Sequence, residues 1–280
     1  MKFTKMQGIG NDYLYINCME GIDFDPVETS IQLSDRHFGV GSDGIILICP
    51  SDVADFKMRM FNADGSEGKM CGNGIRCFAK YVYVKGLTDK TELKIETLSG
   101  IKTVQLTLKD GEVTAVRVDM GSPIFEPSQI PMKYNANDAI CRAISINNSV
   151  WYVTCLSMGN PHCVVLVDDV DSFDVAKNGP GFENDPLFPE RVNTEFIQSI
   201  DGHTIRMRVW ERGSGETMAC GTGACAAAIA AIFYDCIDED TRVITVQLRG
   251  GDLQIEWDRN EGHNTVYMTG PAEFVFEGEA

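Results

Sequence analysis

The chain has 280 residues, of which 44% are hydrophobic and 23% charged, and its formal net charge is −17. This length suits two domains of ordinary size, and the lack of low-complexity tracts indicates a globular protein. No basic patch is visible along the acidic sequence, which argues against nucleic acid and anionic membranes as partners.

No apolar run approaches the length of a membrane span, and the first residues lack the apolar core of a signal peptide. The ten cysteines therefore indicate free thiols in a reducing, cytoplasmic environment rather than a disulfide framework. Most of them fall in apolar strands or helix-like runs, where a cysteine is by default a small buried hydrophobic side chain.

The first half of the chain is predicted to contain seven strands and two helices. A short helix is expected at 28–36 and a longer one from about Asn73 to Lys85, closed by Gly86. The predicted strands are 2–6, 12–17, 44–49, 56–61, 93–96, 103–108 and 113–120.

The second half repeats this order. Strands are predicted at 151–156, 163–167 and 204–210, and a loop rich in Pro, Gly and Asn at 178–189. Segment 224–233 has almost no polar side chain, and a helix that is apolar all round must be wrapped by other structure. We therefore expect an α+β fold in which a mostly antiparallel sheet curls around a central helix, twice.

Two cysteine–glycine turns organise the chain, MCGNG at 70–74 and ACGTG at 219–223. Their cysteines, Cys71 and Cys220, are 149 residues apart (220 − 71). The same offset relates Gly10-Asn11 to Gly159-Asn160 and Phe61-Asn62 to Trp210-Glu211, although no register is convincing between 41 and 54. The chain is therefore interpreted as a duplicated domain, with a period longer than that of solenoid repeats.

A cysteine just before a helix lies beside unpaired backbone N–H groups, which favour a thiolate and a bound anion. Thr222 is expected to cap the second helix. If the two domains meet face to face, a thiolate and a thiol can flank one carbon. One group removes a proton and the other delivers a proton to the opposite face, which inverts the carbon.

Two other sites are weighed and rejected. The segment 39–44 matches a dinucleotide-binding glycine pattern, but a strand rather than a helix is predicted after it. A zinc site is also not expected, since no CxxC pair exists. His162 lies in a turn, and the residues alone leave its role open between a structural one and a place in the site.

Six motifs together resemble the diaminopimelate epimerase family over essentially the whole chain. They are NADGS at 62–66, MCGNG at 70–74, MGNPH at 158–162, RVNT at 191–194, ERG at 211–213 and ACGTG at 219–223. The resemblance implies a cofactor-independent epimerase, without pyridoxal phosphate or metal, that interconverts L,L- and meso-diaminopimelate for lysine and peptidoglycan precursor synthesis. It also implies that the last strand returns to the first domain, giving domains 1–120 with 266–280 and 121–265.

The resemblance further implies a role for each matching residue. Cys71 and Cys220 are the paired acid and base. The reacting carboxylate is held by Gly72, Asn73, Gly221 and Thr222. The reacting centre is surrounded by Asn11, His162 and Glu211, and the distal end of the substrate is held by Asn62, Asn160, Asn193 and Arg212.

One position departs from the family pattern, because Gly44 stands where many members carry Gln. The contact of that amide would have to come from Ser42, from backbone or from water. The resemblance is compatible with a homodimer.

Three other interpretations of the two cysteine turns compete with a diaminopimelate epimerase. In the first, each cysteine is merely a buried side chain before a tight helix start. The second is a proline or hydroxyproline racemase, whose substrates have no distal amino acid end for Asn193 and Arg212 to hold. The third is a non-catalytic amino-acid-binding protein or an isomerase without the thiol pair, against which the presence of both cysteines speaks.

Overall fold

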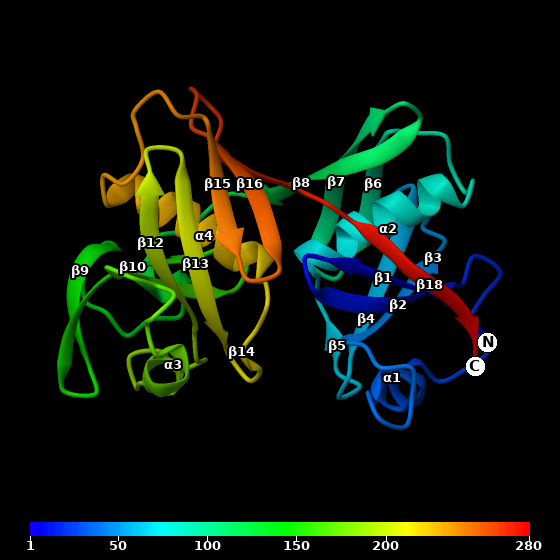
Figure 1. Cartoon of the computed structure of the whole chain (residues 1–280), viewed down its shortest axis with the longest axis horizontal. Helices are drawn as coiled ribbons and strands as arrows, with labels where there is room; N and C mark the ends of the chain where they lie inside the picture. The colour runs from blue at the N-terminus through cyan, green and yellow to red at the C-terminus, as the bar shows by residue number, and fades with distance from the viewer. The chain divides into compact units, whose positions relative to one another are not determined.

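The computed structural model describes residues 1–280 and divides them into two compact units, Met1–Asp119 with Thr269–Ala280 and Met120–Met268. Figure 1 shows a central helix in each unit, α2 (Gly72–Val84) and α4 (Gly221–Phe233), with strands wrapped around it. None of the helices combines the length and hydropathy that crossing a membrane would require. The α+β class and the curled sheet around a helix in each half are confirmed.

The sheet of the first unit runs in the order β18, β1, β2, β3, β4, β6, β7, β8. Only β2–β3 and β4–β6 in this series are parallel pairs. The strands are β1 Lys2–Gly8, β2 Asn11–Asn17, β3 Gly44–Cys49, β4 Phe56–Asn62, β5 Glu67–Gly68, β6 Glu92–Thr97, β7 Gly100–Lys109, β8 Glu112–Gly121 and β18 Glu273–Glu279. The two chain ends lie side by side, where Met1 and Ala280 exchange backbone hydrogen bonds (Figure 1).

The sheet of the second unit has the same pattern in the order β9, β10, β11, β12, β13, β15, β16. Its parallel pairs, β11–β12 and β13–β15, take the places of the two parallel pairs in the first unit. The strands are β9 Ala139–Ile146, β10 Ser149–Ser157, β11 Pro161–Leu166, β12 Asn193–Asp201, β13 Thr204–Glu211, β14 Gly215–Glu216, β15 Val243–Leu248, β16 Gly251–Asp258 and β17 Thr265–Gly270. A 3-10 turn, η1 Pro127–Gln129, precedes β9.

The strand registers extend the 149-residue repeat through the region where the sequence showed no match. Leu14 pairs with Ile45 in the first unit, and Cys163 pairs with Thr194 in the second, which is the same pair shifted by 149 (163 − 14, 194 − 45). Hydrogen-bond register is thus retained where side-chain identity is not.

The two central helices occupy equivalent positions in the repeat, since both have 13 residues and start 149 positions apart (221 − 72). Helix α4 carries no charged side chain, and its residues from Gly223 to Ala231 are buried. Helix α2 is buried along a similar length but contains Arg76, which is fully buried. Wrapping by the sheet explains why a helix without a polar face, α4, is stable here.

The predicted loop at 178–189 is wrong, because α3 (Val175–Glu183) covers its first half. Asp174 caps this helix by accepting a hydrogen bond from Lys177 N, and Phe182 is buried against Trp151 and Phe196. This packing overrides the helix-breaking tendency of Pro180 inside the helix.

The first helix, α1 (Pro26–Ser34), starts two residues before the predicted 28–36. Asp25 caps it by accepting hydrogen bonds from the backbone N–H groups of Val27 and Glu28, and Pro26 occupies the first turn. This Asp-Pro start is a sequence signal that the prediction overlooked.

Candidate functional site

In the first unit, Cys71 is the N-cap of α2, with an extended backbone (φ −128°, ψ 120°). Its Sγ accepts a hydrogen bond from Gly74 N at 3.3 Å, and its carbonyl accepts one from Ile75 N at 2.9 Å. The N–H groups of Gly72 and Asn73 belong to the first turn and have no intrahelical acceptor. The positive end of the helix and these donors make a place for an anion beside the sulfur.

The Cys71 thiol donates a hydrogen bond to Asn11 Oδ1 at 3.2 Å. The other end of that amide, Asn11 Nδ2, donates to Asp43 Oδ2 at 2.6 Å. Asp43 is in turn held by Asp12 N at 3.0 Å and by the Arg36 guanidinium at 3.0 Å. Asn11 and Cys71, both expected in the site, are therefore brought together, and Asp43 is a neighbour that the sequence did not indicate.

The side chain of Asn73 turns inward rather than toward a ligand. Asn73 Oδ1 accepts a hydrogen bond from Arg76 at 2.9 Å, and the fully buried Arg76 also donates to the carbonyls of Gly72 and Pro271. The backbone N–H of Asn73, not its amide, is thus the group that can hold a carboxylate.

Gly44 lies opposite Asn62 at the start of β3 and has φ 154°. A Cβ at this position would lie 2.0 Å from Phe61 O and 2.9 Å from Tyr13, so a larger residue requires the backbone to move. Ser42 does not supply the missing contact, because it is buried and its hydroxyl bonds Ser34 Oγ and Gly44 O. Asn62 Nδ2 donates to Ser66 Oγ at 3.0 Å in the adjoining turn.

In the second unit, Cys220 caps α4 with nearly the same backbone as Cys71 (φ −127°, ψ 113°). Its Sγ accepts from Gly223 N at 3.4 Å. The expectation that Thr222 caps this helix is wrong, because Thr222 lies within the first turn, with its Oγ1 3.6 Å from the sulfur. The extended backbone of Cys220 places the sulfur where a capping oxygen would sit.

A carboxyl group faces Cys220. Glu211, the last residue of β13, lies beside the Cys220 thiol and accepts a hydrogen bond from Thr217 Oγ1 at 2.5 Å. Burial raises the pKa of Glu211. Burial also raises the pKa of Cys220 well above its usual value, and the carboxylates of Glu211 and Glu195 raise it further. A carboxyl and a thiol that both resist ionisation are thus in contact.

His162 is fully buried between two polar partners. Its Nδ1 lies 2.7 Å from Glu195 Oε1, and its Nε2 lies 3.0 Å from Asn160 Oδ1. Glu195 is also fully buried, and its Oε2 has no hydrogen-bond partner. The carboxylate touches the first turn of α4, since a Cβ on Gly223 would lie 2.6 Å from Glu195 Oε1. Glu195 stands in a strand that also carries Asn193, Thr194 and Gln198, so no local signal marked it as a site residue.

The turn that carries Arg212 is held by two side chains. Asn193 Oδ1 accepts from Arg212 N at 2.9 Å, which brings these two predicted residues together. Glu183, from α3, accepts from Gly213 N at 2.8 Å and from Trp210 Nε1 at 2.7 Å. Glu183 was missed because its segment was predicted to be a loop.

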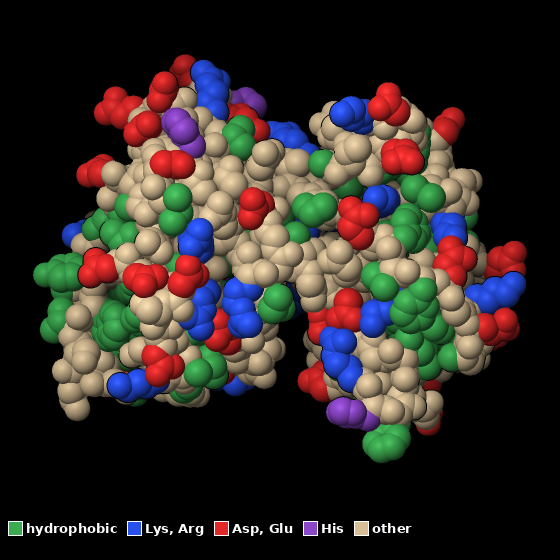
Figure 2. All heavy atoms as spheres, in the orientation of Figure 1, with side chains coloured by type: hydrophobic (Ala, Val, Ile, Leu, Met, Phe, Trp, Pro, Cys, Tyr) green, Lys and Arg blue, Asp and Glu red, His purple; other side chains and the backbone are tan.

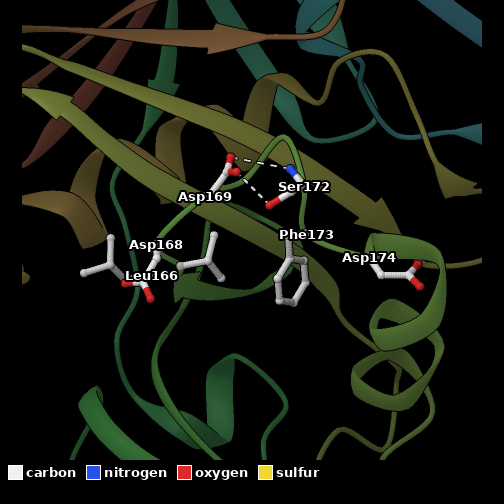
Figure 3. A pocket seen from close by; sticks show the side chains of 7 residues that line it. Leu166, Asp168, Asp169, Ser172, Phe173 and Asp174 are labelled. Carbon is white, nitrogen blue, oxygen red and sulfur yellow. Dashed lines mark hydrogen bonds between the residues drawn. The ribbon is translucent and has the colours of Figure 1, made fainter.

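A hollow of about 480 Å³ in the second unit contains none of the predicted site residues. Figure 3 shows that its Asp169 carboxylate is used by hydrogen bonds from Ser172 N and Oγ. No group of three or more metal-ligating side chains is formed anywhere in the chain. The hollow is lined by Leu166, Val167, Asp168, Asp169, Ser172, Phe173 and Asp174.

Sequence comparison identifies the family. The model of the family described as diaminopimelate epimerase matches residues 3–126 and 154–275. The chain belongs to the diaminopimelate epimerase family. It is 54% identical to the diaminopimelate epimerase of Acetivibrio thermocellus, covering 100% of this chain and 98% of that protein. It is 52% identical to the diaminopimelate epimerase of Methanococcus maripaludis, covering 100% and 99%.

Solved structures show how widely this fold is shared outside the diaminopimelate epimerase family. A phenazine biosynthesis protein of the PhzF family from Bacillus anthracis superposes with a TM-score of 0.71 at 18% identity, over 100% of this chain and 98% of that one. A hydroxyproline epimerase from Agrobacterium vitis gives 0.68 at 14% identity, over 100% and 90%. At these identities the likeness concerns the fold alone.

Proposed function

We propose that this protein interconverts L,L- and meso-diaminopimelate in the cytoplasm, for lysine and peptidoglycan precursor synthesis. Cys71 and Cys220 serve as the two acid–base groups, and neither pyridoxal phosphate nor a metal takes part. The observation that carries the proposal is that both cysteines cap equivalent helices with nearly the same backbone geometry, in a chain of this family.

The proposed reaction moves one proton at a time. A cysteine thiolate takes the α-proton and becomes a thiol, and the electron pair spreads into the neighbouring carboxylate. The other cysteine then gives its thiol proton to the opposite face of the carbon and becomes the thiolate. The first-turn N–H groups of Gly72, Asn73, Gly221 and Thr222 hold the carboxylate and stabilise its growing charge.

The remaining residues divide the substrate between a reacting and a distal end. Asn11, His162 and Glu211 surround the reacting centre, and the contacts of Asn11 with Cys71 and of Glu211 with Cys220 support this. The distal amino acid group is held by Asn62, Asn160, Asn193 and Arg212. The Arg212 guanidinium suits a carboxylate, with which it can pair bidentately.

We also propose that the folding domains are 1–120 with 266–280 and 121–265, and that the protein is a homodimer. Strand β18 supports the homodimer, because its hydrophobic side chains Val275 and Phe276 are 51% and 44% exposed and could be covered by a second copy. Figure 2 shows hydrophobic side chains gathered over the region of β1 and β18, while Lys and Arg lie interspersed with Asp and Glu. Light scattering of wild type and Phe276→Glu tests the dimer.

The activity is tested by incubating the protein with L,L-diaminopimelate in deuterium oxide without added cofactor. Loss of the α-proton signal together with appearance of the meso isomer is the expected result. L-Proline serves as a second substrate, because exchange of its α-proton without reaction of diaminopimelate would instead identify a racemase of the proline type. If neither substrate exchanged its α-proton, the result would contradict a two-thiol mechanism acting on these amino acids.

A further inference from the structure

The Asn11 amide has a defined orientation, and a charged group sets it. An ionised carboxylate only accepts hydrogen bonds, so the end of Asn11 that lies 2.6 Å from Asp43 Oδ2 must be the NH₂ group. The carbonyl end therefore points at Cys71, 3.2 Å from its sulfur. A carbonyl oxygen accepts from a thiol but offers nothing to a thiolate.

We propose that Asp43 is a positioning residue for Cys71, which fixes the Asn11 amide with its oxygen toward the sulfur and so keeps Cys71 in the thiol form. The inference rests on the proposed function, in which Cys71 is one of the two acid–base groups. In the resting enzyme Cys71 then carries its proton and can donate it.

Asp43 is itself held firmly enough to act in this way. Its backbone N–H donates to Asp12 O at 2.7 Å, its carbonyl accepts from Ala63 N at 3.0 Å, and Arg36 binds its second oxygen at 3.0 Å. Flipping the Asn11 amide would place its carbonyl against the Asp43 carboxylate. The repulsion between these acceptors makes the flipped state unfavourable.

Two titratable groups that interact with Cys71 are neutral near pH 7, and a third neighbour, the charged Arg76, binds Gly72 O and Asn73 Oδ1 in the first turn of α2. Burial raises the pKa of Tyr15 well above its usual value, and burial raises the pKa of Cys77 to about 11. Further charged groups adjoin Asn11 in the chain, where Asp12 pairs with Lys5 at 2.9 Å and with Arg36 at 2.7 Å. Burial raises the pKa of Asp43, so acid removes the orienting charge at a higher pH than it would for an ordinary aspartate.

The second unit lacks this device. Asn160 takes the place of Asn11 in the repeat, but its Oδ1 contacts His162 Nε2. The group that meets Cys220 is the Glu211 carboxyl. An amide that fixes the thiol form is thus found in the first unit alone. Cys220 can therefore serve as an internal reference for Cys71 in the same protein.

The test is the pH dependence of alkylation of each cysteine by iodoacetamide, followed by peptide mass spectrometry. In Asp43→Asn, the new amide accepts either orientation of Asn11, so Asn11 can turn its NH₂ toward a Cys71 thiolate. The midpoint pH of Cys71 alkylation should fall by about one unit, which corresponds to the net free energy of one hydrogen bond. The midpoint of Cys220 should not move. Asp43→Glu, which restores a carboxylate, should bring the Cys71 midpoint back toward the wild-type value.

Two controls separate orientation from charge. Asp12→Asn removes the neighbouring carboxylate of the same ion network and should leave the Cys71 midpoint unchanged. In an Asn11→Ala background, Asp43→Asn should produce no further shift. An unchanged Cys71 midpoint in Asp43→Asn, an equal fall in Asp12→Asn, or a shift that persists without Asn11 would overturn the proposal.

A measurement on the unmodified protein covers the case in which Asp43→Asn does not fold. In ¹⁵N-labelled wild type, the side-chain amide resonance of Asn11 should move as acid titrates Asp43. A resonance that does not respond would also overturn the proposal. Alkylation and resonance positions are read without turnover, so inactivity toward diaminopimelate would contradict the proposed function and leave this inference standing.

Discussion

The first turns of α2 and α4 share a backbone but differ in what faces the sulfur. Both helices are capped by a cysteine whose Sγ accepts the N–H of the residue three positions on. Cys71 is partly exposed and meets a neutral amide, whereas Cys220 is 7% exposed and meets a carboxyl. The duplicated fold thus retains the cysteine-capped helix start twice, while the groups that face each sulfur have diverged.

This difference suits an unsymmetrical substrate. Inverting a carbon needs only two acid–base groups and a held carboxylate, and under the proposed function each unit contributes one cysteine and one helix start to that part. The clamp around Arg212, built from Asn193 and Glu183, exists only in the second unit. In the first unit the equivalent turn carries Asn62-Ala63 and no arginine. Under the proposed function, this divergence would hold one end of the substrate still while the other end reacts.

The largest expected effect comes from removing either member of the thiol pair. Cys71→Ala and Cys220→Ala should each lower the epimerisation rate by on the order of 10²–10⁴-fold, the usual contribution of a positioned acid or base. Folding should be retained, as measured by melting temperature. Cys77→Ala and Cys225→Ala, one turn or more further along the same helices, should reduce only stability through the small cavities they leave.

The assignment would fail if Cys225→Ala lost as much activity as Cys220→Ala at unchanged stability. The two helices would then differ in which cysteine reacts, and the equivalence of their first turns would have no catalytic meaning.

Much of the fold and of the cysteine-capped helices could be predicted from the sequence, because the signals for them lie in short stretches of the chain. The two CG turns, the apolar run of α4 and the alternating strands each predict their own structure, and the family motifs name the matching residues. Glu195, Asp43 and Glu183 were missed because their roles arise from tertiary contacts. Each acts on a residue distant in sequence, such as Asn11 for Asp43, 32 positions away. The same holds for α3, in which packing overrides the local signals for a loop.

The second effect concerns the distal end. Arg212→Met should lower kcat/KM for diaminopimelate by the equivalent of about 2–5 kcal/mol, because it removes a charge-assisted contact that also positions the reacting carbon. Exchange of the α-proton of alanine, which has no distal group, should change far less. Arg142→Met, which removes an exposed ion pair with Asp138 in the same unit, is the control.

Deuterium exchange on both substrates measures the two losses. Equal losses on diaminopimelate and alanine would place Arg212 at the reacting centre and remove the proposed division of labour between the units.

A smaller effect is expected from the clamp. Glu183→Gln leaves Gly213 N or Trp210 Nε1 without a good acceptor and weakens the pairing with Arg191, for a loss of about 1–3 kcal/mol. Since the clamp orders the Arg212 turn, the loss should appear in KM for diaminopimelate more than in kcat. Asp171→Asn, which removes an exposed partner of Arg206 away from the turn, should leave KM unchanged. A fall in kcat at constant KM would argue against a positioning role for the clamp.

The smallest expected effect concerns the stability of the fold, and its size depends on pH. Burial raises the pKa of Glu211 above its ordinary value of 4.5, so the fold favours the protonated carboxyl. The stability from such a group is fully present below the unfolded-state pKa and is lost as pH rises through the folded-state value. Glu211→Gln keeps an acceptor for Thr217 and never ionises. The variant should therefore melt above wild type at pH 7.5, with the difference vanishing near pH 4, although its activity is lost.

Glu216 supplies the opposite case in the same unit. Burial works against its ionisation, but hydrogen bonds and charges from Arg208 and Arg249 lower its pKa below the ordinary value. Its stabilising contribution is present above that ordinary value and is lost as the pH falls through the lowered one. Glu216→Gln should thus melt below wild type at pH 7.5 and approach it in acid. Melting curves of the two variants between pH 4 and pH 8 should diverge in opposite directions from wild type. If both variants changed with pH in the same direction, the Glu211 carboxyl would ionise as readily as the ion-paired Glu216. The contrast between the surroundings of Cys71 and Cys220 would then disappear.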